Sequence, residues 1–383
     1  MAVDVSIVPC KSYDADVCRT ALTQALAPFG GLDWVKEGMH IVIKVNLVSA
    51  MKPEQAATTH PMLLCELTKM LRERGASVLL GDSPGGLYTA AHLNHVYDVS
   101  GMHDCEAAGA ELNQDFSQSD ASFPEAVCAK KFTYTAYLDR ADAIIDFCKL
   151  KTHGMMGMTN AVKNYFGVIP GTMKPEYHYK YPKAADFADM LVDLCEYCKP
   201  RLCICDAVVG MEGNGPTAGQ NRHIGLVMAS ENAHALDLAS CYLIDYAPNE
   251  VDTVREAIER GLVCDSAEKI DIAGEDIKPL VIKDYLKPES HFNLIKLISL
   301  PDALNARLIN ALASKPAMDY DICVGCGECA RCCPPKAIDM SSGKPVIDTK
   351  RCIKCFCCQE LCPKKAVKIK RPLLNRFMIK FLK

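Results

Sequence analysis

The chain has 383 residues, a formal net charge of −4 and 49% hydrophobic residues, a balance that is typical of a globular protein and excludes a disordered one. No apolar run reaches the roughly 18 residues that a membrane-spanning helix needs. The acidic balance and the lack of a recognition motif argue against a nucleic-acid partner. The length leaves room for two or three domains.

Residues 3–290 alternate between short apolar runs and amphipathic stretches. The predicted strands are Val3–Val8, Ile41–Leu47, Ser77–Leu80, Ala143–Cys148, Leu202–Val209 and Ile224–Ala229. The predicted helices are Val17–Ala27, Pro61–Arg74, Ala184–Cys198 and Ala235–Asp245. Because strands that alternate with helices form βαβ units, we expect an α/β body over residues 1–290, with a mostly parallel sheet and helices on both faces.

Polar residues cluster where these predicted strands end, which is where open parallel sheets bind ligands. The third strand exits into GDSPGG, residues 81–86, where Gly85 and Gly86 can turn successive N–H groups inward as an anion nest. An ordinary tight loop with an Asx turn at Asp82 is the alternative. The candidate anion-binding residues of this edge are Lys44, Asn46, Ser83, Gly85 and Gly86.

The stretch KLKTHGMMGMTNAVKNYFGVIPG, residues 149–171, concentrates polar groups that serve no hydrophobic purpose. Lys151, Lys163 and Asn164 indicate recognition of a phosphate or carboxylate, or stabilisation of a developing anion. His153 is a candidate general acid or base, or a metal ligand, with a structural histidine as the alternative. The candidate catalytic residues are therefore His153, Asp82 and Lys151.

Four cysteines, Cys195, Cys198, Cys203 and Cys205, form a further cluster that could bind zinc or a third iron–sulfur cluster. The first two lie one turn apart on a predicted helix, and the other two alternate along a predicted strand. We therefore favour their burial as small apolar side chains.

Two copies of one cysteine pattern follow each other near the C-terminus. Residues 323–334 and 352–363 both read C-x2-C-x2-C-x3-C-P, and flanking residues such as Asp319 and Asp348 match at the same offset of 29 residues. This spacing holds [4Fe–4S] clusters, whereas a zinc ribbon needs a longer spacer and would leave cysteines over. The duplicated segment resembles the bacterial two-[4Fe–4S] ferredoxin module, which implies electron transfer and a redox partner protein.

In that bacterial arrangement the fourth cysteine of each run ligates the other cluster. The predicted ligands of the first cluster are Cys323, Cys326, Cys329 and Cys362. Those of the second cluster are Cys352, Cys355, Cys358 and Cys333. Cys332 and Cys357 fall outside this register and are expected to pack nearby. Gly325 and Gly327 are expected to let the backbone approach a cluster.

The segments around the cysteine runs complete the predicted domain layout. A helical connector is expected over residues 291–315, a small α+β ferredoxin-like domain over 316–370 and a basic amphipathic tail over 371–383. We expect the tail to dock on protein in preference to a peripheral membrane contact. From Lys350 onward eleven basic residues accompany one acid, Glu360. This surplus indicates a docking face for acidic partners or a membrane, or, as we favour, neutralisation of the anionic clusters.

The 22 cysteines fit a reducing compartment, and the first ten residues, MAVDVSIVPC, lack the features of a secretory signal. We therefore expect a cytoplasmic protein. The combination IKVNLV, GDSPGG, KLKTHGMMGMTNAVKNYFGVIPG and DAVVGMEGNGP resembles the domain-of-unknown-function 362 family over nearly all of residues 1–315. The resemblance implies this body with a C-terminal two-cluster module, and it implies no reaction.

The favoured function is an iron–sulfur oxidoreductase that passes electrons through two [4Fe–4S] clusters to an anionic substrate or cofactor in the body. Lys151, Lys163 and Asn164 would hold the anion, and His153 or Asp82 would handle protons. A non-catalytic electron carrier and an iron–sulfur-dependent binding or maturation module are the alternatives. No nucleotide or flavin fingerprint is present, so any additional cofactor stays unnamed.

Overall fold

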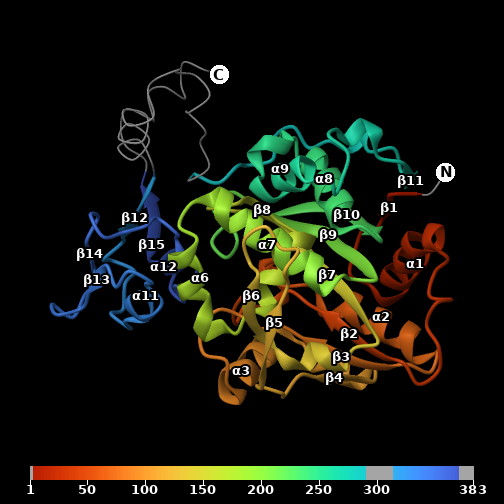
Figure 1. Cartoon of the computed structure of the whole chain (residues 1–383), viewed down its shortest axis with the longest axis horizontal. Helices are drawn as coiled ribbons and strands as arrows, with labels where there is room; N and C mark the ends of the chain where they lie inside the picture. Colours follow the sequence, from red (N-terminus) through yellow and green to blue (C-terminus); the bar gives the residue numbers. More distant parts are fainter. Residues whose placement is uncertain (1–2, 290–313, 371–383) are drawn as a thin grey trace.

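The computed structural model describes residues 3–289 and 314–370, which form an α/β body and a small cysteine-rich module (Figure 1). The strands of the body are β1 (Val5–Pro9), β2 (His40–Lys44), β3 (Ser77–Gly81), β4 (Ala110–Leu112), β5 (Gln118–Ser122), β6 (Lys131–Thr135), β7 (Ala143–His153), β8 (Gly157–Thr159), β9 (Leu202–Glu212), β10 (Gln220–Ser230) and β11 (Ile272–Gly274). Its helices are α1 (Ala15–Leu26), α2 (Pro61–Arg72), α3 (Ala90–Ser100), α4 (Asp104–Ala107), α5 (Ala161–Asn164), α6 (Lys174–Lys180), α7 (Ala184–Cys198), α8 (Ala233–Leu243) and α9 (Asp252–Glu259).

One sheet organises the described body. Its strand order is β11-β1-β10-β9-β7-β2-β3-β4, with β8 paired to β7. Neighbouring strands are parallel from β9 to β4, whereas β10 runs antiparallel to both β9 and β1. The chain builds outward from β2 to β3 and β4, and then returns to place β7 on the other side of β2. The strand order therefore reverses between β2 and β7.

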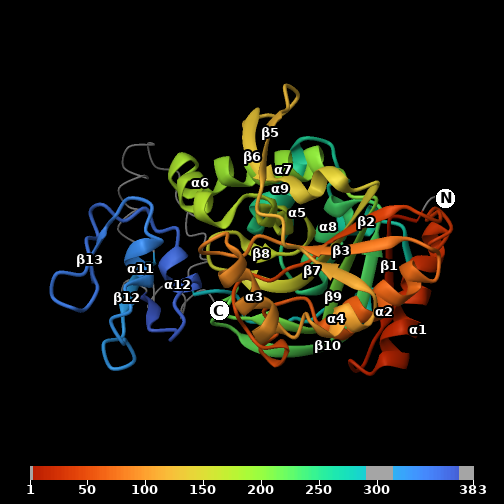
Figure 2. The ribbon, with the colours of Figure 1, turned by 90° about the horizontal axis from the view of Figure 1, so that it is seen from below.

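Helices cover both faces of this sheet, as predicted (Figure 2). On one face α1 and α2 pack residues such as Leu22 and Leu63 against Ile43 of β2. On the other face α7 and α8 contribute residues such as Leu191 and Leu236 to a second core. The predicted fold, a mostly parallel sheet between two helical layers, is confirmed.

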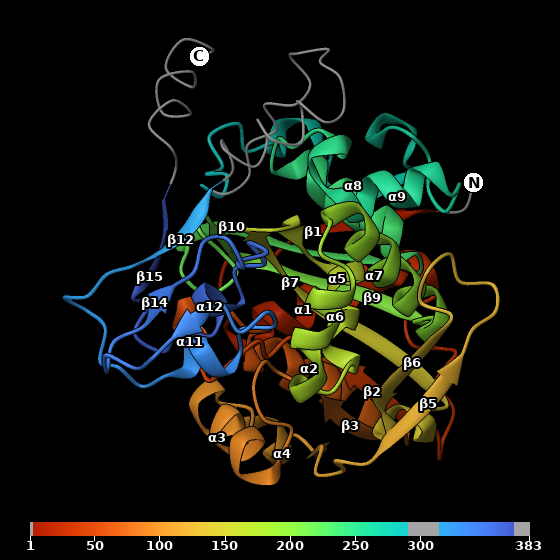
Figure 3. The ribbon, with the colours of Figure 1, turned by 60° about the vertical axis from the view of Figure 1, so that its left-hand side comes forward.

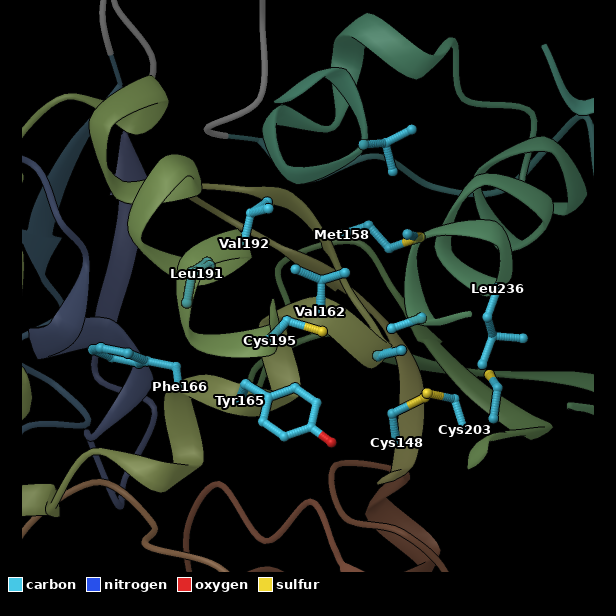
Figure 4. Close-up of a cluster of buried hydrophobic side chains, with 14 of the residues drawn as sticks. Cys148, Met158, Val162, Tyr165, Phe166, Leu191, Val192, Cys195, Cys203 and Leu236 are labelled. Atoms are coloured by element: carbon cyan, nitrogen blue, oxygen red, sulfur yellow. The ribbon is translucent and has the colours of Figure 1, made fainter. Parts of the chain in front are cut away.

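The second core also contains the cysteines that we expected to be buried. Cys195 lies among apolar side chains that include Val162 and Leu191, and Cys203 lies on the adjoining strand (Figure 4). Cys203 and Cys205 are fully buried, and Cys198 is half-buried. The side chains fill the core as small apolar groups.

Two central strands extend further than their apolar runs. β7 continues through Lys149, Lys151 and His153, and β9 continues to Glu212. Their charged side chains are buried, because other elements of the body supply hydrogen-bond partners for them. A prediction based on apolar residues therefore ends these strands too early, and it places on a loop residues that belong to a strand.

The module lies at one end of the body, next to α6 (Figures 1 and 3). Its elements are β12 (Lys315–Met318), α11 (Glu328–Arg331), β13 (Ile338–Asp339), β14 (Val346–Ile347), α12 (Cys357–Glu360) and β15 (Val367–Lys370). β12 pairs with β15, and β13 pairs with β14. Of the helical connector predicted at 291–315, residues 291–313 lie outside the described residues, and Lys315 already belongs to β12. The predicted tail at 371–383 also lies outside the described residues.

The sequence duplication reappears in the backbone of the module. Left-handed φ angles of 72° at Gly325 and 78° at Gly327 recur as 60° at Lys354 and 61° at Phe356, each 29 residues later. The two halves therefore share one loop conformation, which glycine adopts freely and other residues adopt at a cost. Within residues 3–289 and 314–370, no helix combines the length and the apolar character that crossing a bilayer requires.

Candidate functional site

The reversal of strand order between β2 and β7 opens a crevice at the carboxyl ends of the strands, the usual ligand position in such sheets. Lys151 on β7 donates a hydrogen bond of 2.6 Å to Oδ1 of Asn46, in the loop after β2. The Asn46 amide donates in turn to Oδ1 of Asn164 at 2.9 Å. Asn164 donates to the buried Asp146 at 2.6 Å, so the chain of bonds ends in the core. This network fixes the Lys151 side chain.

A buried ion pair lies behind the network. The Lys44 ammonium lies 2.9 Å from Asp82 and donates to the carbonyl of Val45 and to Oδ1 of Asn164. A Cβ at Gly167 would overlap both charged groups, so only glycine lets the backbone pass this close. The three N–H groups of the Lys44 ammonium are therefore used within the protein, which argues against its predicted role in anion binding.

The short helix α5 carries Lys163 and Asn164 and is positioned by α8. The N–H groups of Ala161 and Val162 donate to the two carboxylate oxygens of Asp237, at 2.8 and 3.2 Å. This carboxylate satisfies N–H groups that the first turn of a helix leaves without intrahelical partners. The position of Lys163 is thereby set from the core.

A cavity of about 800 Å³ lies between the body and the module. It brings together eight of the ten predicted body residues, namely Asn46, Asp82, Ser83, Gly85, Gly86, Lys151, Lys163 and Asn164. Lys44 and His153 are not on its wall. Residues separated by more than a hundred positions in the sequence thus line one space.

Three lysines of the body line this cavity without a carboxylate partner within 4 Å among the described residues: Lys151, Lys163 and Lys174. Burial lowers the pKa of Lys151 to about 7 and that of Lys174 to about 8, and it also lowers the pKa of Lys163. Burial disfavours the charged form of an amine, and the neighbouring ammonium groups add to the effect. An anion in the cavity would offset both the desolvation of these ammonium groups and their mutual repulsion.

The two predicted acid–base residues other than Lys151 are held by the protein itself. Asp82 accepts from the N–H groups of Leu47 and Ser83 and pairs with Lys44, so both of its oxygens are occupied by the protein. Nδ1 of His153 accepts from the N–H groups of Met155 and Met156, at 3.1 and 3.2 Å. These contacts favour the structural alternative for His153.

The loop GDSPGG does not form the predicted pair of inward N–H groups. The N–H of Gly85 donates to the carbonyl of Val48 at 3.0 Å, and only Gly86 has a positive φ, of 108°. The Ser83 side chain accepts from the N–H of Gly171 at 2.7 Å. The loop therefore shapes the cavity wall, and its N–H groups at Ser83 and Gly85 serve the protein. The helix that follows begins at Ala90.

The module contains two hollows, and each is lined by one of the predicted cysteine sets. One is lined by Cys323, Cys326, Cys329 and Cys362, and the other by Cys333, Cys352, Cys355 and Cys358, with Cys357 beside them. All 22 cysteines lie in the described residues, and none forms a disulfide there. Backbone N–H groups donate to Cys333 and Cys362 sulfur at 3.2 Å, as they do to cluster ligands. Four thiols around each hollow fit a [4Fe–4S] cluster.

The module meets the body through α12. Thr217 donates to the carbonyl of Glu360 at 2.9 Å, and Gln359 donates to the carbonyl of Asn214 at 3.1 Å. This contact places Cys362 on the wall of the large cavity as well as in its own hollow. One predicted cluster ligand therefore faces the lysines of the body.

Lys174, Phe166 and Glu360 are among the residues of the cavity wall that were not predicted from the sequence. Lys174 follows the polar stretch as a single lysine, and Phe166 reads as an ordinary core residue. Glu360 appeared only as the one acid in a basic segment, and that isolation was a usable signal. Its charge opposes the lowering of the lysine pKa values.

A separate group with metal-ligand geometry occurs at Cys195, Glu196 and His234, whose ligand atoms lie within 4.8 Å of one another. Nε2 of His234 already contacts Glu196 at 2.8 Å, and burial keeps the Cys195 pKa well above its ordinary value. A hydrogen bond between His234 and Glu196 and a neutral thiol at Cys195 account for this group.

Family models match both parts of this architecture. The model of a domain of unknown function (DUF362) matches residues 41–242, and that of a 4Fe-4S dicluster domain matches residues 315–363. A thylakoid-associated protein of Synechocystis sp. is 30% identical over 293 residues, which cover 76% of this chain and 89% of that protein. The lactate racemase apoprotein from Thermoanaerobacterium thermosaccharolyticum aligns with a TM-score of 0.41 and 12% identity, over 64% of this chain and 58% of that one.

The fold and the cysteine hollows define the class: an α/β protein with a C-terminal iron–sulfur dicluster domain of the electron-transfer type. The chain belongs to the domain-of-unknown-function 362 family.

Proposed function

We propose that the protein is an iron–sulfur reductase that acts on an anionic small molecule bound between the body and the module. The observation that carries this proposal is the shared cavity, which is lined by Lys151 and Lys163 on one side and by Cys362 on the other. An anion held by the lysines lies beside a cluster ligand. A carrier that only docks redox partners has no need of such a cavity.

The two cysteine sets that line the hollows would each hold one [4Fe–4S] cluster, in the crossed arrangement. Each cluster supplies one electron at a time when it is bound. A redox partner protein provides these electrons, and the substrate takes up two electrons and two protons. Electrons, protons and charge therefore balance without a further cofactor.

Lys151 donates one of these protons, and water supplies the other. Its ammonium lies on the cavity wall, and its pKa of about 7 lies near neutral pH, where a general acid is most effective. Asn46 and Asn164 position Lys151, and Lys163 binds the anion. Asp82 and His153 keep structural roles. The cytoplasmic location stays a prediction.

The test uses full-length protein purified without oxygen and reduced with dithionite. Small anions are added one at a time, and reoxidation of the clusters is followed by visible absorbance. We expect at least one anion to reoxidise the wild-type protein, and Lys151→Ala to slow that reaction while keeping its iron. Lys180→Ala, an exposed lysine outside the cavity, is the control. Unchanged reoxidation in Lys151→Ala would favour the carrier.

A further inference from the structure

The charges around the cavity are unbalanced. Within the described residues the lining has five cationic side chains and three carboxylates. Asp82 is paired with Lys44, and Glu328 is paired with Arg331 at 2.6 Å. Of the carboxylates on the wall, only Glu360 is left to face the lysines. The free positive charge is concentrated on the body side, near α5 and α6.

Lys163 and Lys174 approach the same aromatic ring. Their Nζ atoms lie 5.7 Å and 5.0 Å from the centroid of Phe166. The ring itself packs edge-on against Phe187 at 5.1 Å, so it is a fixed support. Lys174 donates to the carbonyl of Ser83 at 2.5 Å, which holds its ammonium at the wall. The two cations thus converge from α5 and α6.

Lys163 differs from Lys151 and Lys174, the other two lysines that the body contributes to the cavity. In residues 3–289 and 314–370 its ammonium has neither a hydrogen-bond acceptor nor an ion-pair partner, and its side chain is half-buried. A partly desolvated ammonium without a partner is unfavourable. Its three donors are available to a ligand inside the cavity.

We propose that Lys163 and Lys174 bind the phosphate group of a small organic phosphate, and that organic phosphates are the substrate class of this protein. The assignment to a substrate rests on the proposed function, whereas the binding site rests on the cavity alone. A phosphate group carries close to two negative charges at neutral pH and three acceptor oxygens. It can satisfy both ammonium groups, whereas one carboxylate brings a single charge.

The size and remaining lining of the cavity favour an organic phosphate over inorganic phosphate. A volume of about 800 Å³ suits a ligand of many atoms, since sites for such ligands span roughly 300–1,000 Å³. Apolar side chains line the rest of the wall, among them Val48, Met51 and Leu361. An organic group packed against Leu361 would lie next to Cys362, where electrons arrive.

Isothermal titration calorimetry on the iron-loaded full chain tests the site without requiring turnover. The probes are phenyl phosphate, inorganic phosphate and benzoate. We expect phenyl phosphate to bind most tightly, and Lys163→Ala and Lys174→Ala each to weaken it about tenfold, the effect of losing one charge-assisted hydrogen bond. Lys163→Arg should retain most of the affinity. Lys180→Ala, on the same helix as Lys174, should bind as the wild type does.

Three results would overturn the inference: benzoate binding as tightly as phenyl phosphate, inorganic phosphate binding as tightly as phenyl phosphate, or unchanged affinity in both alanine variants. Iron content and circular dichroism show whether each variant is folded. Lysine-dependent binding of phenyl phosphate, together with no cluster reoxidation by any organic phosphate, would support the site and reject the reductase. The phosphate-binding site and the reductase function can therefore be rejected independently of each other.

Discussion

Glu360 of the module lies beside His153 of the body, with its Oε2 atom 3.9 Å from the imidazole Nε2. In the chain Glu360 stands between Cys358 and Cys362, which line different hollows. The contact therefore ties the position of both hollows to the end of β7, the strand that also carries Lys151. The geometry between cluster ligands and the lysine wall depends on this docking.

Docking also depends on a glycine of the cavity wall. A Cβ at Gly85 would overlap the Leu361 side chain. We expect Gly85→Ala to weaken docking by about 1–3 kcal/mol, the cost of overpacking. Hydrogen exchange should become faster in residues 357–361 and 214–217. The double variant with Leu361→Ala should restore slow exchange, and wild-type exchange in Gly85→Ala alone would show that this contact does not limit docking.

The ten cysteines of the module should fall into two groups. Cys333→Ser and Cys358→Ser each remove one ligand of the second predicted cluster, and we expect iron to fall from about eight towards about four atoms per chain. Cys332→Ser and Cys357→Ser should keep the full content, because neither residue is in the ligand register. Iron and sulfide analysis of oxygen-free protein measures this. Iron loss in Cys357→Ser would show that its place beside the second hollow reflects ligation.

Lys151 should make stability depend on pH. Its pKa is about 7 in the folded protein and roughly 10.4 in an unfolded chain, so between these values the unfolded state binds more protons and the free energy of unfolding rises with pH. Lys151→Met removes this contribution. We expect the stability of the variant relative to the wild type to be greatest near pH 6 and to shrink by pH 9, in urea titrations of the body. A constant difference would contradict the lowered pKa.

The two halves of the module should respond differently to one substitution. Gly325 has a φ of 72°, and a Cβ there would lie 2.7 Å from the carbonyl oxygen of Gly343. Gly325→Ala should therefore destabilise the module by about 2 kcal/mol and speed iron release in denaturant. Lys354→Ala, at the equivalent position, replaces one non-glycine residue by another and should change stability far less. Equal effects would mean that neither the left-handed φ of Gly325 nor its close approach to Gly343 limits the stability of the module.

The fold could be predicted from the sequence because its strands and helices differ in the period of their hydrophobic residues. Strands such as 41–47 and helices such as 184–198 appear as regular patterns, and the order of elements implies a parallel sheet. The ends of β7 and β9 could not be predicted from the sequence, since the burial of Lys149 and Lys151 depends on partners elsewhere in the chain. Lys149, for example, pairs with Asp206 at 2.8 Å.

The candidate site could be predicted from the sequence only in part. The cysteine spacing and the polar stretch at 149–171 are dense local signals, and the structure gathers most of these residues around two hollows and one cavity. Lys44 shows the limit of such a prediction, because the sequence cannot distinguish a lysine that faces a ligand from one that is buried in an ion pair with Asp82. Lys174 shows the converse, since a solitary lysine gains meaning only from the ring of Phe166 beneath it.

The central claim is that an anion on the lysine wall lies next to an iron–sulfur cluster. Electron paramagnetic resonance of the dithionite-reduced protein, with and without phenyl phosphate, tests it most directly. We predict that phenyl phosphate changes the cluster signal in the wild type and in Lys180→Ala at the same concentration, and that Lys163→Ala needs an about tenfold higher concentration for the same change. Identical spectra at a phenyl phosphate concentration that saturates the calorimetric signal would contradict the account.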